Sequence, residues 1–266
     1  MKEWVVKARN AFVFPLQISY SMGMLKNITC VDMHLYDMLY VSYLIPVTRL
    51  ERVIPASLLP AEAAPGKVFI TLVIFRGKTS GAMMIPVPHI PFDQVNIRTY
   101  VIDPVTKKPA VYFIHCGISG AVITFLYRIL SRMPVEHTNL SIHTVKESDG
   151  TYSLYELSGL WHGKFVIRAH ERARHVDTLE PFSSRHEAMV YLIDPLVGFY
   201  DVGGTMRRLE IFHKPLDPRL CYVSEVEFPY LVNRSLVEAD EILEPHNIML
   251  VPYTPFRIYL PPATFH

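Results

Sequence analysis

A strand–turn–strand–helix pattern over residues 94–136 constrains the fold of this chain more than any other feature. Residues 94–102 alternate between polar and apolar side chains, and residues 110–116 form a second β-rich run after a short polar turn. An amphipathic helix is predicted over residues 119–133, and Pro134 ends it. A hairpin that leads directly into a helix favours a fold that combines β-strands and helices.

The first of these strands carries a polar face. Side chains alternate along a strand, so Gln94, Asn96, Arg98 and Tyr100 share one face, opposite the apolar set that includes Val95. Such a face either meets water or lines a cavity. Arginine suits the second role because its planar fork donates two hydrogen bonds to a carboxylate.

Two interpretations of Arg98 stay open at this point. In the first, Arg98 contacts an anionic or carbonyl-bearing ligand. In the second, it pairs with an internal carboxylate such as Glu136 or Glu156, because an arginine held among apolar residues needs a partner of opposite charge.

Strand patterns outnumber helical patterns along the rest of the chain. Helical segments are predicted only at residues 47–53 and 184–193, besides the helix at 119–133, and Ser183 is the expected N-cap of the helix at 184–193. We therefore predict a single domain over residues 1–266 with a mainly antiparallel, barrel-like α+β fold. The further strands are predicted over residues 38–45, 68–75, 138–145, 152–157, 160–170, 206–213, 221–227, 248–253 and 257–260.

Two further predictions concern local structure. Residues 77–91, with three prolines, are predicted to form a long loop that serves as a lid or pocket wall. The helix at 119–133 is predicted to present one apolar stripe, with Arg128 and Arg132 on its polar side. The stripe comprises Val122, Phe125, Leu126, Ile129, Leu130 and Met133.

Composition narrows the class of protein. Half of the residues are hydrophobic, 19% are charged and the formal net charge is +1, so a large core is available and no basic segment favours nucleic acid or an anionic membrane as a partner. The three cysteines are widely spaced and form no CxxC, which favours a reduced, cytoplasmic protein. No run approaches the roughly 18–20 apolar residues of a membrane span. The apolar segment at 11–25 is interrupted by polar residues, unlike a signal peptide.

Several motifs are missing from the sequence. It contains no GxGxxG, no GxxxxGK[ST] and no GxSxG, and its closest histidine pairs match no recurrent metal-ligand spacing. We therefore expect no cofactor and no metal. His115 and Cys116 are neighbours on a strand, so their side chains point to opposite faces and do not form a thiol–imidazole couple.

The order of motifs resembles that of a known family. Asn96-Ile-Arg98-Thr-Tyr100-Val, then Val111-Tyr-Phe, then a helix with Arg128 and Pro134, and finally His213-Lys-Pro215, are similar to the YqjF-like uncharacterised proteins, which are related to acetoacetate decarboxylase. The resemblance extends over most of the chain. It implies a β-rich, barrel-like sandwich around a small-molecule cavity, and only loosely a function.

The resemblance also indicates which chemistry has been lost. In acetoacetate decarboxylase a lysine directly after a proline forms a Schiff base with the ketoacid, but here Val135 and Glu136 follow Pro134. Gln94 stands where the decarboxylase strand carries a helpful glutamate. Lys107 and Lys108 lie in the predicted hairpin turn, where solvated amines keep their ordinary pKa of about 10.4 and form no imine. Acetoacetate decarboxylation is therefore not expected.

Two functional hypotheses remain. The first is a small-molecule-binding protein that acts on a carboxylate- or carbonyl-bearing metabolite, with catalysis left open. The second is a non-catalytic structural or interaction module whose cavity is filled by side chains. Whether the chain forms a homo-oligomer also stays open. The candidate ligand-binding residues are Gln94, Asn96, Arg98, Tyr100, Arg128, Glu136 and His213.

Overall fold

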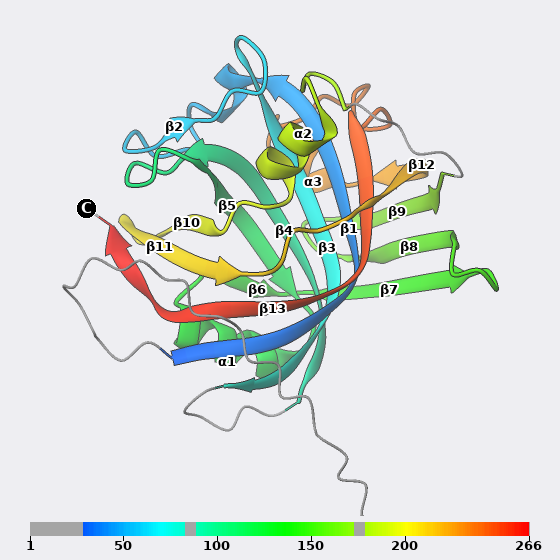
Figure 1. Cartoon of the computed structure of the whole chain (residues 1–266), viewed down its shortest axis with the longest axis horizontal. Helices are drawn as coiled ribbons and strands as arrows, with labels where there is room; N and C mark the ends of the chain where they lie inside the picture. Colours follow the sequence, from blue (N-terminus) through cyan, green and yellow to red (C-terminus); the bar gives the residue numbers. More distant parts are fainter. Residues whose placement is uncertain (1–28, 83–88, 173–178, 266) are drawn as a thin grey trace, which may run out of the picture.

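Seven strands close into a mixed β-barrel in the computed structural model, which describes residues 29–82, 89–172 and 179–265 (Figure 1). The barrel closes where the first and last strands pair antiparallel along most of their lengths. Among the seven barrel strands, β5 and β10 form the one parallel pair of neighbours; the short strand β6 outside this set also pairs parallel with β5. In order around the barrel, the strands are β1 (Thr29–Pro46), β3 (Lys67–Ala82), β4 (Pro91–Ile102), β5 (Pro109–Ile118), β10 (Val197–Val202), β11 (Thr205–Phe212) and β13 (Asn247–Phe265).

A second, antiparallel group of strands extends to one side of the barrel (Figure 1). It joins the barrel through a short pairing between β12 and β13. Its strands are β7 (Asn139–Lys146), β8 (Tyr152–Leu160), β9 (Lys164–Glu171) and β12 (Arg219–Glu227). Two short strands, β2 (Leu59–Pro60) and β6 (Val135–His137), pair with β4 and β5. The helices are η1 (Val47–Leu50), α1 (Ala121–Ser131), α2 (Arg185–Leu192) and α3 (Pro229–Asn233).

The barrel strands bury apolar side chains on both faces, which explains their nearly continuous apolar sequences. On β3, Ile70 and Leu72 join a cluster that contains residues of β7, β8 and β9. Phe69 and Val73 face the other way, into a cluster that contains the buried residues of α2. We call the first cluster the outer core and the second the inner core.

The mainly antiparallel architecture and the two principal helices are confirmed. The helix expected at 119–133 is α1, and the helix expected at 184–193 is α2. Ser184, rather than Ser183, caps α2 by accepting a hydrogen bond from the backbone N–H of Glu187. No helix in the described parts of the chain has the length and apolar character needed to cross a bilayer.

The structure corrects the strand boundaries in several places. β3 extends to Ala82, so much of the predicted loop at 77–91 is strand; residues 83–88 lie outside the described residues. The run predicted at 160–170 is divided by the turn between β8 and β9. β10 was not predicted at all, because its six residues carry no clear alternation.

The last strand also differs from its prediction. The prolines of the C-terminal segment suggested two strands, yet β13 is continuous from Asn247 to Phe265. Pro252 lies opposite Asp37, where the β1–β13 pairing skips one residue on each strand. Because the ladder is interrupted there, the missing N–H of proline costs no hydrogen bond.

The predicted apolar stripe of α1 is buried only in part. Val122, Phe125 and Ile129 are more than half exposed. Leu130 and Met133 of the stripe do pack against the inner core, together with Ile123 and Tyr127, which were not part of the predicted stripe.

Candidate functional site

The polar face of β4 points into the inner core. Gln94, Asn96, Arg98 and Tyr100 are all buried, with exposed fractions of 8% or less. Their strand neighbours Val95 and Ile97 belong to the outer core. The predicted alternation therefore places the polar residues inside the barrel rather than on a surface that faces water.

Arg98 is anchored by the end of α2. Its Nη2 donates a hydrogen bond of 2.7 Å to the carbonyl oxygen of Leu192, and the Tyr100 hydroxyl donates to the same oxygen at 2.8 Å. Leu192 is the last residue of α2. The final carbonyls of a helix lack intrahelical partners and carry the negative end of the helix dipole, so this end attracts a cation.

No carboxylate neutralises Arg98 within the described residues. It is the one arginine among them that falls in the buried class, and it takes part in none of their ion pairs. Glu156 pairs with Arg168, and Glu136 bonds to other residues. The guanidinium instead lies 5.4 Å and 5.6 Å from the ring centres of Tyr40 and Tyr100.

Two polar atoms of this face are left without partners in the described residues. They are Nε of Arg98 and Oε1 of Gln94. The Gln94 amide donates to Asn96 at 2.6 Å, and Gln94 also hydrogen-bonds with the Tyr127 side chain. A buried donor and a buried acceptor without partners are expensive for a folded protein, and they are typical of a place where a ligand or water binds.

His213 lies near the same group. Its side chain is buried, stacks on Phe256 with ring centres 5.6 Å apart, and hydrogen-bonds through Nδ1 to the Lys214 carbonyl at 2.9 Å. Burial lowers the pKa of His213, while the nearby Asp194 carboxylate raises it and the Arg98 charge lowers it further. Burial raises the pKa of Asp194 itself.

Two of the candidate residues lie elsewhere. Arg128 is on α1, where its Nε donates to the Val135 carbonyl at 2.7 Å and ties the helix to β6. Glu136 faces away from the barrel interior, because its neighbour Val135 fills the inner core. Five of the seven candidates are therefore buried: Gln94, Asn96, Arg98 and Tyr100 share one face of β4, and His213 is close enough to Arg98 for that charge to act on its imidazole.

The site also contains residues that the sequence did not single out. They are Tyr40, which interacts electrostatically with Arg98, and Asp194, which interacts electrostatically with His213. Tyr40 and Asp194 also interact with each other. Tyr40 lies on the predicted strand at 38–45, but its strand has apolar residues on both faces and so gives no sign of which one meets Arg98. Asp194 follows α2, and only the folded chain brings it near His213.

Glu136 is instead the centre of a separate polar cluster. Its Oε1 lies 3.0 Å from Nε2 of His115, and its Oε2 lies 3.0 Å from Nε2 of His162. Trp161 donates to Oε2 at 2.8 Å. Burial favours the neutral carboxyl, but the hydrogen bond from Trp161 and the two histidines outweigh burial and lower the pKa of Glu136. Burial lowers the pKa of His115.

Cys116 takes no part in this cluster. It lies on the opposite face of β5 from His115, as the strand alternation predicts, and is 1% exposed in the inner core. Burial raises the pKa of its thiol well above the ordinary value. Cys30 and Cys221 are likewise free and buried.

No amine of the described residues reaches the inner core. Lys107 and Lys108 lie in the turn between β4 and β5, and both are exposed. Lys107 has a φ of 58° and donates its backbone N–H to Asp103, which identifies a tight turn. The other described lysines are also exposed, at positions 67, 78, 146, 164 and 214.

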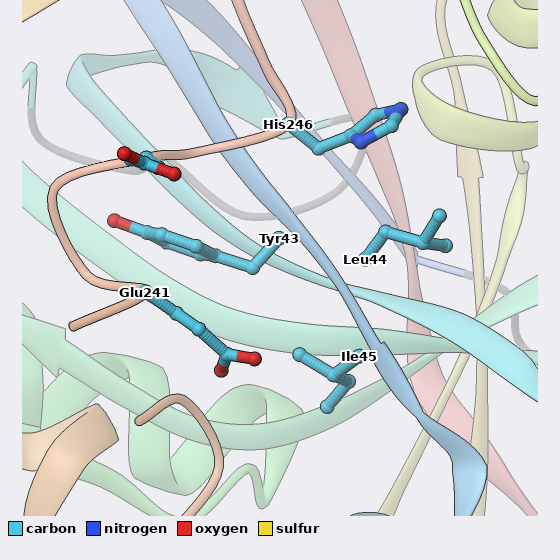
Figure 2. Close-up of a pocket in the computed structure, with 6 residues that line it drawn as sticks. Tyr43, Leu44, Ile45, Glu241 and His246 are labelled. Atoms are coloured by element: carbon cyan, nitrogen blue, oxygen red, sulfur yellow. The ribbon is translucent and has the colours of Figure 1, made fainter. Parts of the chain in front are cut away.

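A pocket on the surface lies apart from these residues (Figure 2). It is lined by Tyr43, Leu44, Ile45, Glu241, Glu244 and His246. The Tyr43 hydroxyl donates to the Ile242 carbonyl at 2.8 Å, and Glu241 pairs with Arg49. These polar groups hold the segment before β13 against β1, so we assign the pocket a structural role.

Comparison with solved structures shows which fold this is. The enduracididine biosynthesis enzyme MppR complexed with pyruvate has a TM-score of 0.53 and 12% identity, covering 88% of this chain and 90% of its own. An acetoacetate decarboxylase-like enzyme from Sphingomonas wittichii has a TM-score of 0.54 and 11% identity, covering 89% and 92%. Acetoacetate decarboxylase from Legionella pneumophila has a TM-score of 0.51 and 11% identity, covering 97% and 94%. At these identities the likeness shows the fold alone, which is that of acetoacetate decarboxylase.

Sequence comparison supplies the family. A search of curated proteins found no match. A family model described as an uncharacterized conserved protein, DUF2071, matches residues 32–255. The more specific YqjF-like resemblance stays a prediction. The match spans most of the chain, including the whole polar face of β4, and the chain therefore belongs to the DUF2071 family.

Proposed function

We propose that this protein binds a small carboxylate-bearing metabolite inside the barrel, at Arg98, and does so without forming an imine. The observation that carries the proposal is the state of Arg98: it is buried, it has no carboxylate partner in the described residues, and its Nε has no hydrogen-bond acceptor. A buried, unneutralised guanidinium is costly, and an anion that accepts its free N–H offsets that cost.

The surroundings of Arg98 fit such a ligand. Tyr40 and Tyr100 flank the guanidinium with aromatic rings, and Gln94 offers an unpartnered amide oxygen on the same strand face. Among proteins of this fold, MppR has been captured with pyruvate, a small carboxylate. The shared fold makes a compound of that class a reasonable first ligand to test here.

The chemistry open to this group is acid–base chemistry at a carbonyl. An imine needs an amine in the barrel, and the position after Pro134 is Val135. His213, whose pKa is lowered by burial, is an uncharged base near neutral pH. Arg98 would hold the carboxylate, and His213 with Asp194 would exchange a proton with the rest of the ligand.

The alternative is a non-catalytic module with a filled barrel, and one observation favours it. The Leu192 carbonyl already accepts from Arg98, and α2 places Ala188, Met189 and Leu192 in the inner core. In this case Arg98 ties α2 to β4 and has no ligand.

Calorimetric titration with pyruvate distinguishes the two functions. Wild type, Arg98→Met and the exposed control Arg52→Met are compared, together with their melting temperatures. Loss of a charge-assisted hydrogen bond costs about 1.5–3 kcal/mol, so we expect Arg98→Met to weaken binding from roughly tenfold to over a hundredfold. Arg52→Met should bind like wild type, and all three proteins should melt cooperatively.

Two results would support the structural alternative. One is loss of the cooperative transition in Arg98→Met, which would make Arg98 a structural tie between β4 and α2. The other is a wild type that binds neither pyruvate nor longer 2-oxoacids.

A further inference from the structure

The second polar cluster lies on the opposite side of the barrel wall from Arg98. His115 is on β5, where it pairs with the outer-core residue Ile97. Glu136 is on β6, and His162 is in the turn between β8 and β9. The cluster therefore joins the barrel to the second group of strands, and the proposed carboxylate site uses none of its residues.

The spacing of these side chains matches that of ligands around a metal ion. The His115 Nε2 and His162 Nε2 atoms each lie 3.0 Å from a Glu136 oxygen, and one ligand atom from each residue falls within 4.8 Å of the others. Metal–ligand bonds of about 2.0–2.2 Å place neighbouring ligand atoms roughly 3–3.5 Å apart. Two imidazoles and one carboxylate are also a donor set that zinc and iron(II) accept in open, catalytic sites.

A second shell of hydrogen bonds holds two of the three ligands in place. Nδ1 of His115 lies 3.0 Å from the Tyr230 hydroxyl, and Trp161 donates its indole N–H to Glu136 at 2.8 Å. Metal-bound histidines and carboxylates usually have such partners, which fix their orientation. The His115 ring also packs edge-on against the stacked rings of Trp161 and Tyr230, with centres 4.9 Å and 5.2 Å away.

Two glycines and a left-handed backbone conformation at His162 allow the side chains of this cluster to pack together. A Cβ on Gly117 would lie 3.2 Å from the Trp161 ring and 2.9 Å from Thr138, so glycine permits the indole to pack beside His115. His162 has a φ of 52°, a left-handed conformation that histidine adopts more readily than most residues, and Gly163 follows with a φ of 128°. Gly163 packs directly against Pro229, which brings the Tyr230 end of α3 to the turn.

The cluster has a buried side and an open side. The side chain of His115 is 15% exposed, whereas those of Glu136 and His162 are 43% and 39% exposed. A metal ion can enter from solvent and keep water at the remaining positions. Arg234 lies over the Tyr230 ring, 5.4 Å from its centre, and its charge helps to lower the pKa of His115.

From this geometry we propose that His115, Glu136 and His162 bind a divalent transition-metal ion such as Zn²⁺. The protein supplies three ligands and leaves the remaining coordination positions open to water. Tyr230 and Trp161 are positioning residues that orient the ligands. The histidine spacings in the sequence did not predict it, because the ligands come from three segments that only the folded chain brings together.

The test uses the full chain after treatment with a chelator and dialysis. Zn²⁺ affinity is measured by competition with a chromophoric chelator for wild type, His162→Ala, Glu136→Gln and His143→Ala. His143 is an exposed histidine on the neighbouring strand β7 and serves as the matched control. We expect one Zn²⁺ per wild-type chain, a loss of more than about tenfold in affinity for His162→Ala and Glu136→Gln, and no change for His143→Ala.

Two further measurements separate a metal site from a hydrogen-bonded network. Zn²⁺ should raise the melting temperature of wild type and of His143→Ala, but not that of His162→Ala. Trp161→Phe keeps an aromatic ring, smaller than the indole, but removes the donor to Glu136, and should weaken binding about ten- to a hundredfold. If His162→Ala fails to fold, the Zn²⁺ affinity of Glu136→Gln serves as the test of the metal site. Glutamine can still accept the hydrogen bond from Trp161, so this variant keeps that contact. The proposal is overturned if wild type binds no Zn²⁺, or if His143→Ala loses as much affinity as the cluster variants.

Discussion

At the scale of single residues, the inner core collects groups whose charge depends on what surrounds them. Arg98 lacks a counter-ion in the described residues, and His213 stays neutral because burial disfavours its protonated form. The polar face of β4 could be predicted because strand alternation is a local property. The Leu192 carbonyl could not, since a backbone atom 94 positions away leaves no trace in the sequence around Arg98.

The lowered pKa of His213 gives a pH dependence with a definite sign. An unfolded histidine titrates near pH 6.5, and the folded one titrates lower, so the unfolded chain binds the extra proton first as the pH falls. The stability linked to His213 is therefore complete above about pH 6.5 and is lost below it. The charges of Asp194 and Arg98 act on the same imidazole. Both residues are present in wild type and in the His213→Gln variant with which it is compared below.

We expect the melting temperature of wild type to fall more than that of His213→Gln when the pH is lowered from about 7.5 to 5.5. His115, whose pKa is also lowered, is present in both proteins, so the difference between the two curves isolates His213. Parallel curves would mean that His213 is not held neutral in the folded protein.

At the scale of elements, α1 shows that a correctly placed helix can bury a face that matches the predicted one only in part. The helical pattern predicted its position, but six apolar residues spread over a wide arc and did not define which side is buried. Contact with β6 and β13 decides the side, and this contact depends on tertiary structure. Ile123 is 4% exposed, whereas Phe125, only two positions away, is 62% exposed.

Urea denaturation of two alanine variants tests this orientation. Ile123→Ala should lower the free energy of unfolding by about 2–5 kcal/mol, because it leaves a cavity in the inner core. Phe125→Ala should change it by less than about 0.5 kcal/mol, because the ring already contacts water. Equal losses for the two variants would mean that α1 is rotated relative to the structure described.

At the scale of the whole molecule, the barrel is held by pairings between distant parts of the chain. β1 pairs with β13 from Thr29–Leu260 to Ser42–Asn247, and β5 pairs with β10 although α1, the strands β6 to β9 and α2 separate them in the chain. Most strands were predictable because their apolar pattern is local. Which strands are neighbours, and the parallel β5–β10 pair in particular, depends on closure of the barrel, and no local pattern encodes it.

Barrel closure also decides which chemistry the interior can perform. The position that follows Pro134 is filled by Val135, and every described lysine is on the exterior, out of reach of a ligand inside the barrel. Treatment with acetoacetate or pyruvate followed by borohydride should therefore leave the intact mass unchanged, while an acetoacetate decarboxylase treated in parallel should gain a reduced adduct. Peptide mapping adds a check on position: an adduct on Lys107 or Lys108 would show that the β4–β5 turn is not the solvated hairpin seen here. An unchanged mass together with pyruvate binding that requires Arg98 would mean that the barrel recognises the carboxylate and leaves the carbonyl without covalent capture.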